Sequence, residues 1–200
     1  MLFVGASNTS NLLEQGLIEQ NDHHMISGVS GLSLHNKDPE KNVFHLLRGR
    51  NTPVVLNHDV INNSITDYTP KKGKNRGKTL KGLEEEEFWA LMPSVKELGV
   101  VAIVMHPRND GPKFVNNKED KLRQWFVTID ISRALGNSWR QFCKNKGNSV
   151  ENIHLPACLE RRFTQQVIQC ASIENLMQIN KIKHKNRKPG RGSRAKNNYW

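Results

Sequence analysis

One short segment constrains the fold more than any other feature of the sequence. Residues 100–105 read Val-Val-Ala-Ile-Val-Met, an unbroken apolar run that ends shortly before Pro107. Runs of this length that are rich in β-branched residues are typical of strands covered on both faces. The segment 53–58, Pro-Val-Val-Leu-Asn-His, has the same character. Strands of this kind predict a parallel sheet between two layers of helices.

The remaining apolar residues fit the same architecture. Residues 1–4 and 24–29 are weaker strand candidates, and segments with helical spacing cover 8–18, 88–98 and 159–171. Strands that alternate with helices favour βαβ units. We therefore expect an α/β fold, a flavodoxin-like, doubly wound parallel sheet of about five strands with helices on both faces. The fifth strand comes from 125–131, or else the sheet has a shortened edge strand.

Charge divides the chain into a core and two basic segments. The net charge is +11, yet residues 71–81 contribute six Lys or Arg and residues 181–200 contribute eight, with no acid in either segment. Without these fourteen charges, the rest of the chain carries about −3. We expect one folded domain over 1–180, with a basic loop at 69–82 that is a disordered insertion or a contact for polyanions. The segment 181–200 is expected to be a disordered basic tail.

The tail suggests a partner. Its Arg-Gly spacing and its final Tyr199-Trp200 are typical of contact with single-stranded nucleic acid through charge and stacking. The same charges are equally compatible with a nuclear localisation signal. The candidate nucleic-acid contacts are Lys183, Lys185, Arg187, Lys188, Arg191 and Arg194.

Two other classes of protein find little support. No segment approaches the ~20 apolar residues that span a bilayer, and we see no signal peptide. The expectation is an intracellular protein, cytoplasmic or nuclear, with no membrane partner. Asp22-His23-His24 lacks a third ligand at a suitable spacing, so we expect no metal and no cofactor.

Ser7 and His154 are the candidate catalytic residues. Ser7 follows the first predicted strand at a strand-to-helix turn, where a serine is either a nucleophile or the N-cap of the helix. His154 precedes the last predicted helix, and Glu151 lies three residues before it. An acid at that spacing can orient an imidazole within a turn.

Four sequence blocks resemble the SGNH (GDSL-type) hydrolases, in order across residues 1–171. Val4-Gly5-Ala6-Ser7-Asn8-Thr9 is similar to the block whose Gly-Asp-Ser turn carries the nucleophile. The segment 26–32 is similar to the block whose glycine donates an oxyanion N–H, and 54–63 to the block that supplies an asparagine. Glu151-Asn152-Ile153-His154-Leu155 resembles the Asp-x-x-His block.

The resemblance implies a serine esterase or acyl hydrolase that acts on a small ester or acylated substrate. It implies a triad of Ser7, His154 and Glu151, and an oxyanion hole of the Ser7 and Gly31 N–H groups with the Asn62 side chain. Asn63 is the alternative to Asn62.

The sequence departs from the family pattern at four positions, two of them in the third block, where Asp59 lies near the usual glycine and Asn63 stands where the family has Asp. Ala6 stands where the family has Asp, and Glu151 replaces Asp with an acid one methylene longer. The alternative function is therefore an inactive binding module on the same scaffold, attached to nucleic acid by its tail. A hydrolase-like domain beside a basic segment also resembles the esterase parts of some animal retroelement proteins.

Overall fold

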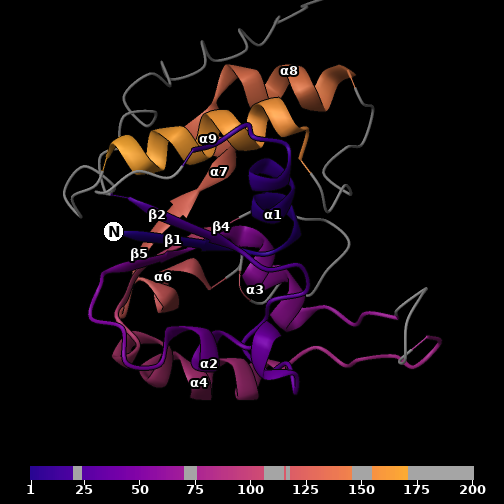
Figure 1. The fold of residues 1–200 in the computed structure, drawn as a ribbon, viewed down its shortest axis with the longest axis vertical. Helices are drawn as coiled ribbons and strands as arrows, with labels where there is room; N and C mark the ends of the chain where they lie inside the picture. The colour runs from indigo at the N-terminus through magenta and orange to yellow at the C-terminus, as the bar shows by residue number, and fades with distance from the viewer. Residues whose placement is uncertain (20–23, 70–75, 106–114, 116–117, 146–154, 171–200) are drawn as a thin grey trace, which may run out of the picture.

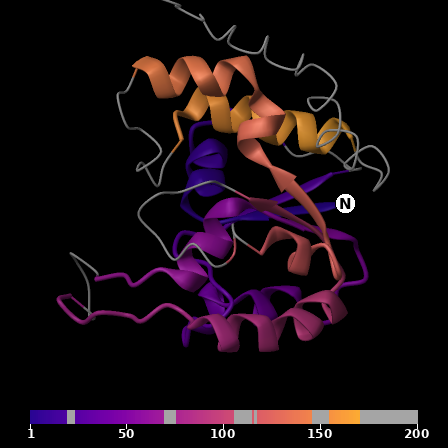
Figure 2. The same cartoon turned by 180° about the vertical axis from the view of Figure 1, so that it is seen from behind.

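The computed structural model describes residues 1–19, 24–69, 76–105, 115, 118–145 and 155–170. Glu151, His154 and the tail at 181–200 lie outside these residues, so the predictions made for them remain predictions. The described part is an α/β fold with one sheet between two helical layers (Figures 1 and 2).

The sheet has five parallel strands in the order β2-β1-β3-β4-β5, which confirms the predicted doubly wound architecture. The strands are β1 (Leu2–Gly5), β2 (Met25–Gly28), β3 (Val54–Leu56), β4 (Val100–Met105) and β5 (Val127–Asp130). The chain moves from β1 to one edge through β2 and then to the other side through β3. The order therefore reverses between β1 and β3, and the carboxyl ends of strands at such a reversal are the usual place for a ligand site.

The helices divide between the two faces of the sheet (Figure 1). One layer contains α1 (Ser7–Glu14), α7 (Ile131–Leu135), α8 (Asn137–Asn145) and α9 (Ala157–Gln169). The other contains α2 (Val43–Leu47), α3 (His58–Ile65), α4 (Glu85–Glu97) and α6 (Glu119–Leu122). A short 3₁₀ turn, Pro39–Lys41, precedes α2.

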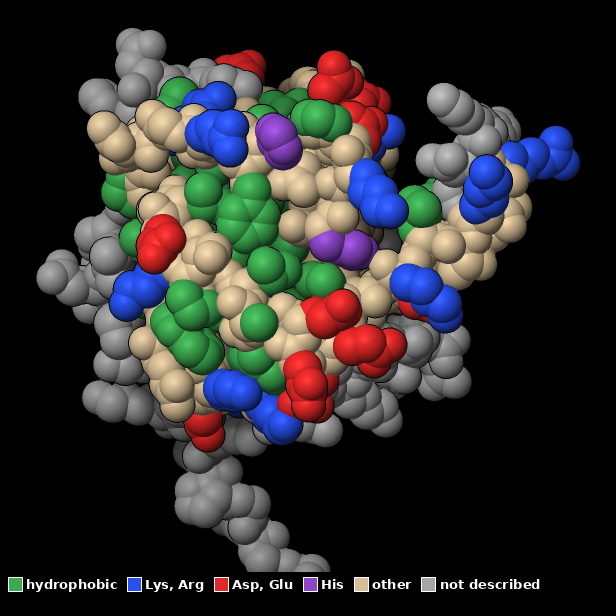
Figure 3. Space-filling view, turned by 90° about the horizontal axis from the view of Figure 1, so that it is seen from below, with side chains coloured by type: hydrophobic (Ala, Val, Ile, Leu, Met, Phe, Trp, Pro, Cys, Tyr) green, Lys and Arg blue, Asp and Glu red, His purple; other side chains and the backbone are tan. Residues whose placement is uncertain are grey.

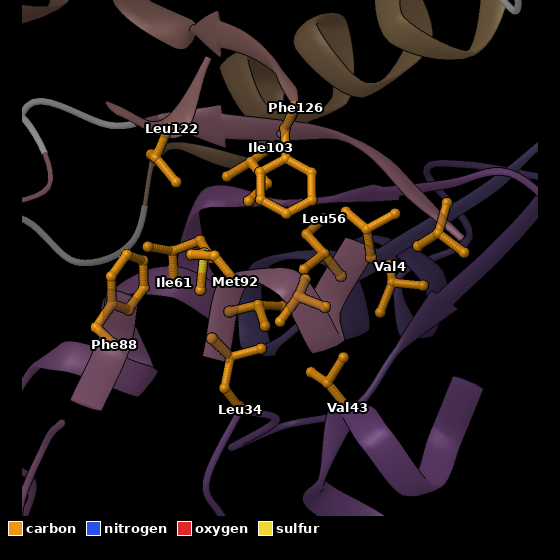
Figure 4. Packing of buried hydrophobic residues seen from close by; sticks show 14 of the residues in the cluster. Val4, Leu34, Val43, Leu56, Ile61, Phe88, Met92, Ile103, Leu122 and Phe126 are labelled. Atoms are coloured by element: carbon orange, nitrogen blue, oxygen red, sulfur yellow. The ribbon is translucent and has the colours of Figure 1, made fainter. Parts of the chain in front are cut away.

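Alternation along the strands sends side chains into both layers. Val4 and Leu56 pack toward α4, whereas Phe3 and Val55 pack toward α9. Figure 4 shows the α4 side, where Phe88 and Met92 of α4 belong to the same cluster of buried hydrophobic residues as Val4 and Leu56 of the strands. Burial on both faces explains why β3 and β4 are continuous apolar runs in the sequence.

Several elements differ from, or refine, the sequence prediction. Residues 127–130 supply the fifth strand, so the sheet edge is present, although the strand is only four residues long. The predicted strand 53–58 ends at Leu56, because Asn57 caps a helix that begins at His58. That helix, α3, was not predicted. The first helix ends at Glu14, four residues earlier than expected.

Two glycines allow α1 to approach the sheet closely. A Cβ on Gly28 would lie 2.4 Å from the backbone nitrogen of Ser10, and a Cβ on Gly5 would lie 1.8 Å from the Thr9 Oγ1 atom. Real Cβ atoms do not come so close to other atoms, so any larger residue at these strand ends displaces α1. The position of Ser7, on the first turn of α1, thus depends on both glycines.

Gly28→Ala should lower the free energy of unfolding by about 1–3 kcal/mol, because the new methyl group overpacks against the backbone of α1. Gly16→Ala is the control, since a Cβ there meets no atom within 4 Å and costs only the strain of its positive φ of 63°. Urea unfolding followed by circular dichroism measures both. A smaller loss for Gly28→Ala than for Gly16→Ala would contradict this account of the packing.

Candidate functional site

Ser7 lies two residues beyond β1, at the reversal of the sheet order. It is the first residue of α1, and the N-cap is Ala6, which makes no side-chain capping bond. The interpretation of Ser7 as an N-cap is therefore wrong. Ser7 is partly exposed, and neither its hydroxyl nor its backbone N–H bonds to another described residue.

The cap comes instead from a distant carboxylate. The Asp59 Oδ1 atom accepts a hydrogen bond from the Ala6 N–H at 2.9 Å, and its Oδ2 atom accepts one from the Asn8 N–H at 2.9 Å. Asp59 thus accepts hydrogen bonds from the N–H groups of the residues on both sides of Ser7, but not from the N–H group of Ser7. The turn is held from α3, and the serine is free of a structural task.

Asp59 is completely enclosed. Burial raises its pKa above the ordinary value, and the Glu160 carboxylate adds to that rise. The neighbouring His58 and the two N–H donors act in the opposite direction. The rise shows that loss of hydration outweighs these favourable contacts.

A second polar group lies beside Asp59 and joins three segments of the chain. The Asn57 Nδ2 group donates to the Glu160 Oε1 atom at 2.7 Å and contacts the Thr9 Oγ1 atom at 3.3 Å. The His58 Nε2 atom lies 3.1 Å from the other Glu160 oxygen. Glu160 belongs to the first turn of α9, and its side chain is 1% exposed. This polar cluster, made of Thr9, Asn57, His58 and Glu160, ties α9 to the end of β3 and to α1.

Sequence reasoning missed this cluster. The His58 side chain is 0% exposed and cannot meet a substrate, so it is not an alternative catalytic base. One signal was available: Glu160 lies three and seven positions before Phe163 and Val167, so it shares their buried face. A charged residue on the buried face of a helix needs a polar partner, and Glu160 has two, Asn57 and His58.

Asn62 and Asn63, the two asparagines considered for the oxyanion hole, differ in their hydrogen bonds. Asn62 was expected just past a strand end, but it lies within α3, six residues after β3. Its Nδ2 atom is buried and has no partner among the described residues. The Asn63 amide donates to the Leu32 carbonyl at 3.1 Å. Of the two side chains, that of Asn62 therefore has an amide N–H available to hold an oxyanion.

Gly31 lies three residues beyond β2 in an exposed turn with a φ of 81°. Its carbonyl accepts a hydrogen bond from the Asn36 amide at 3.1 Å. Its N–H forms no backbone hydrogen bond within the described residues. A positive φ favours glycine here, which suits a turn that exposes an N–H group.

A shallow apolar groove lies on the opposite helical layer, between the segment after β2 and α4 (Figure 3). It has a volume of about 500 Å³, and its two polar side chains with titratable groups are His35 and Glu87. His35 bonds to the Lys81 carbonyl, and Glu87 accepts from the Glu84 N–H. Both side chains thus make structural contacts, which leaves the Ser7 turn as the better candidate for chemistry.

The comparisons with known proteins identify no relative: no family model, no curated protein and no solved structure matches this chain. Within the described ranges there is no group of three or more His, Cys, Asp or Glu side chains that could hold a metal ion. The helices in those ranges are also too short or too polar to cross a membrane. The assignment of function therefore depends on the fold and on the geometry around Ser7.

Asp59→Asn should lower the free energy of unfolding by about 1–3 kcal/mol, because it places an NH₂ group where a carboxyl oxygen faces a backbone N–H, whether or not that carboxyl is protonated. The difference in the free energy of unfolding between the wild type and Asp59→Asn should also depend on pH. Since the folded state raises the pKa of Asp59, this group contributes most below the ordinary carboxyl value of 3.8 and loses that contribution as the pH rises through the raised pKa.

Urea titrations at several pH values from 4 to 8 test both points. Asp120→Asn is the control, because the Asp120 side chain is 94% exposed and its ion pair with Arg123 lies on the surface. A stability difference between wild type and Asp59→Asn that grows with pH would contradict the assignment.

Proposed function

We propose that the protein is a serine acyl hydrolase of the SGNH type that cleaves small esters with a Ser7–His154–Glu151 triad. One observation carries the proposal: Asp59 takes the N–H groups on either side of Ser7, while the hydroxyl and the N–H of Ser7 remain unused by the described residues. A nucleophilic serine needs a free hydroxyl, and the tetrahedral intermediate needs a donor beside it.

The two hydrogen bonds of Asp59 also bear on the difference from the family pattern at residue 6. The family has a structural Asp where this chain has Ala6, whose side chain is buried in the apolar core. A carboxylate nevertheless holds this turn, because Asp59 supplies it from α3. The loss of the Asp before the serine is thus compatible with an ordered nucleophile.

The polar cluster supports His154 as the base. It fixes the first turn of α9 close to Thr9, which lies two residues after Ser7 on the same helix. His154 precedes α9 by three residues, and an extended chain of three residues spans at most about 11 Å. A base on the chain just before α9 is therefore compatible with the position of Ser7.

The mechanism follows from these roles. His154 removes the proton from the Ser7 hydroxyl as Ser7 attacks the ester carbonyl. Glu151 orients the imidazole and stabilises the imidazolium. The Ser7 and Gly31 N–H groups and the Asn62 amide hold the oxyanion. The alcohol leaves with the proton from His154, and water activated by the same histidine then releases the acid.

Ser7→Ala should lower the hydrolysis of p-nitrophenyl acetate by about a hundredfold or more and abolish labelling by a fluorophosphonate probe. The fold should persist, since Asp59 and not Ser7 caps α1. Ser10→Ala is the matched control: it removes a hydroxyl from the same helix, and that hydroxyl bonds only to Glu14. Equal labelling of wild type and Ser7→Ala would exclude Ser7 as the nucleophile.

His154→Ala should cost as much activity as Ser7→Ala, because the members of a catalytic unit fail together. Glu151→Ala should cost less, since its longer arm makes it a weaker orienter. His45→Ala, on the exposed surface of α2, serves as the control. If the wild type neither hydrolyses the ester nor reacts with the probe, the hydrolase proposal fails and the inactive binding module becomes the better hypothesis.

A further inference from the structure

A two-stranded ribbon projects from the domain between α3 and α4. Tyr68 and Leu80 form an antiparallel pair in which each N–H bonds to the other residue's carbonyl, at 2.8 and 2.7 Å. The hydroxyls of Thr69 and Thr79 are 2.9 Å apart. We call residues 67–69 and 76–81 the basic ribbon.

The base of the ribbon is fixed to the domain. The Asp67 carboxylate accepts from the Gly82 N–H at 3.0 Å and pairs with Lys81. The Leu83 N–H bonds to the Ser64 carbonyl of α3 at 2.8 Å. A Cβ on Gly82 would lie 2.5 Å from the Ile65 carbonyl carbon, so the two segments are in close contact. The ribbon is thus presented in one orientation.

The two faces of the ribbon differ in chemistry. In an antiparallel pair, residues directly opposite share a face and alternate residues repeat it. The pairs Asp67–Lys81 and Thr69–Thr79 therefore lie on one face, where their polar groups satisfy each other. Tyr68 and Leu80 lie on the other face together with Lys78.

The Tyr68 face is open to solvent. Tyr68 is 59% exposed and Leu80 is 42% exposed, and these are two of the three large exposed hydrophobic side chains in the described residues. Arg76 and Lys78 are also exposed, and no acid lies between residues 71 and 81. Figure 3 shows the ribbon at the right, with Lys and Arg side chains along it and clear of the main body.

We propose that this face of the basic ribbon binds single-stranded nucleic acid, with a base stacked on Tyr68 and phosphates at Lys78 and Arg76. An aromatic ring beside cations is the combination that such strands require, and the adjacent acid, Asp67, lies on the opposite face and is paired with Lys81. An anionic membrane would need a larger apolar surface than one tyrosine and one leucine provide. The residues of this site are different from those of the 181–200 tail and from those of the proposed hydrolase site.

Binding of the full-length protein to a fluorescent oligo(dT) of about 15 nucleotides, measured by anisotropy, tests the proposal. Tyr68→Ser should weaken binding about fivefold or more, because the base loses its stacking partner. Thr79→Ala is the control on the opposite face. Arg76→Gln with Lys78→Gln should reduce the slope of log K against log salt by about 1.4, at 0.7 for each lost phosphate contact.

The tail keeps its eight positive charges in every variant, so differences between variants report on the ribbon. Lys96→Gln, which removes one exposed charge from α4, controls for net charge. Heparin has no bases, so Tyr68→Ser should leave heparin binding unchanged. Wild-type affinity of Tyr68→Ser for oligo(dT), or stronger binding to vesicles of anionic phospholipid than to the oligonucleotide, would overturn the proposal.

Discussion

The carboxylate of Asp59 is the group on which the Ser7 turn depends. A buried carboxylate loses its hydration, and the raised pKa of Asp59 records that loss. Its two hydrogen bonds to the Ala6 and Asn8 N–H groups satisfy donors that the start of α1 would otherwise leave without partners. Because Asp59 of α3 caps α1, the side chain of Ser7, the first residue of α1, is not needed as the helix cap.

The polar cluster beside Asp59 makes the carboxyl edge of the sheet one cooperative unit. Asn57 connects Thr9 of α1 to Glu160 of α9, positions 48 and 103 residues away from it in the sequence. Removing one member leaves buried polar atoms without partners, which costs more than the lost bond itself. The hydrogen bonds from Asn57 to Thr9 and Glu160 favour one arrangement of these side chains. The start of α9 and the Ser7 turn are therefore held in one geometry.

The sheet could be predicted from the sequence because its central strands are buried on both faces. Residues 100–105 and 54–56 leave no other reasonable interpretation, and the order of elements then favours a parallel sheet. Helix α3 could not be found in this way. Its N-cap, Asn57, directly follows the apolar residues of β3 and was assigned to the strand, and five of the eight residues of the helix, His-Asp-Val-Ile-Asn-Asn-Ser-Ile, are polar.

Those polar residues resemble a loop because their partners lie far away in the sequence. The buried carboxylate of Asp59 accepts hydrogen bonds from the N–H groups of Ala6 and Asn8. The buried hydroxyl of Ser64 accepts one from the N–H group of Leu34. A local pattern cannot show such pairs. The block similar to the SGNH hydrolases did lead to Ser7, but it gave no indication that Asp59 would hold the turn.

Helix α3 connects the two surfaces that we propose to be functional. Its first turn carries Asp59, which holds the Ser7 turn, and its last turn carries Ser64 and Ile65, which contact the base of the ribbon. Eight residues of helix span about 12 Å. Hydrogen bonds anchor both ends of α3, at the Asp59 side chain in its first turn and at the Ser64 carbonyl in its last. This one helix therefore sets the spacing between the base of the ribbon and the Ser7 turn.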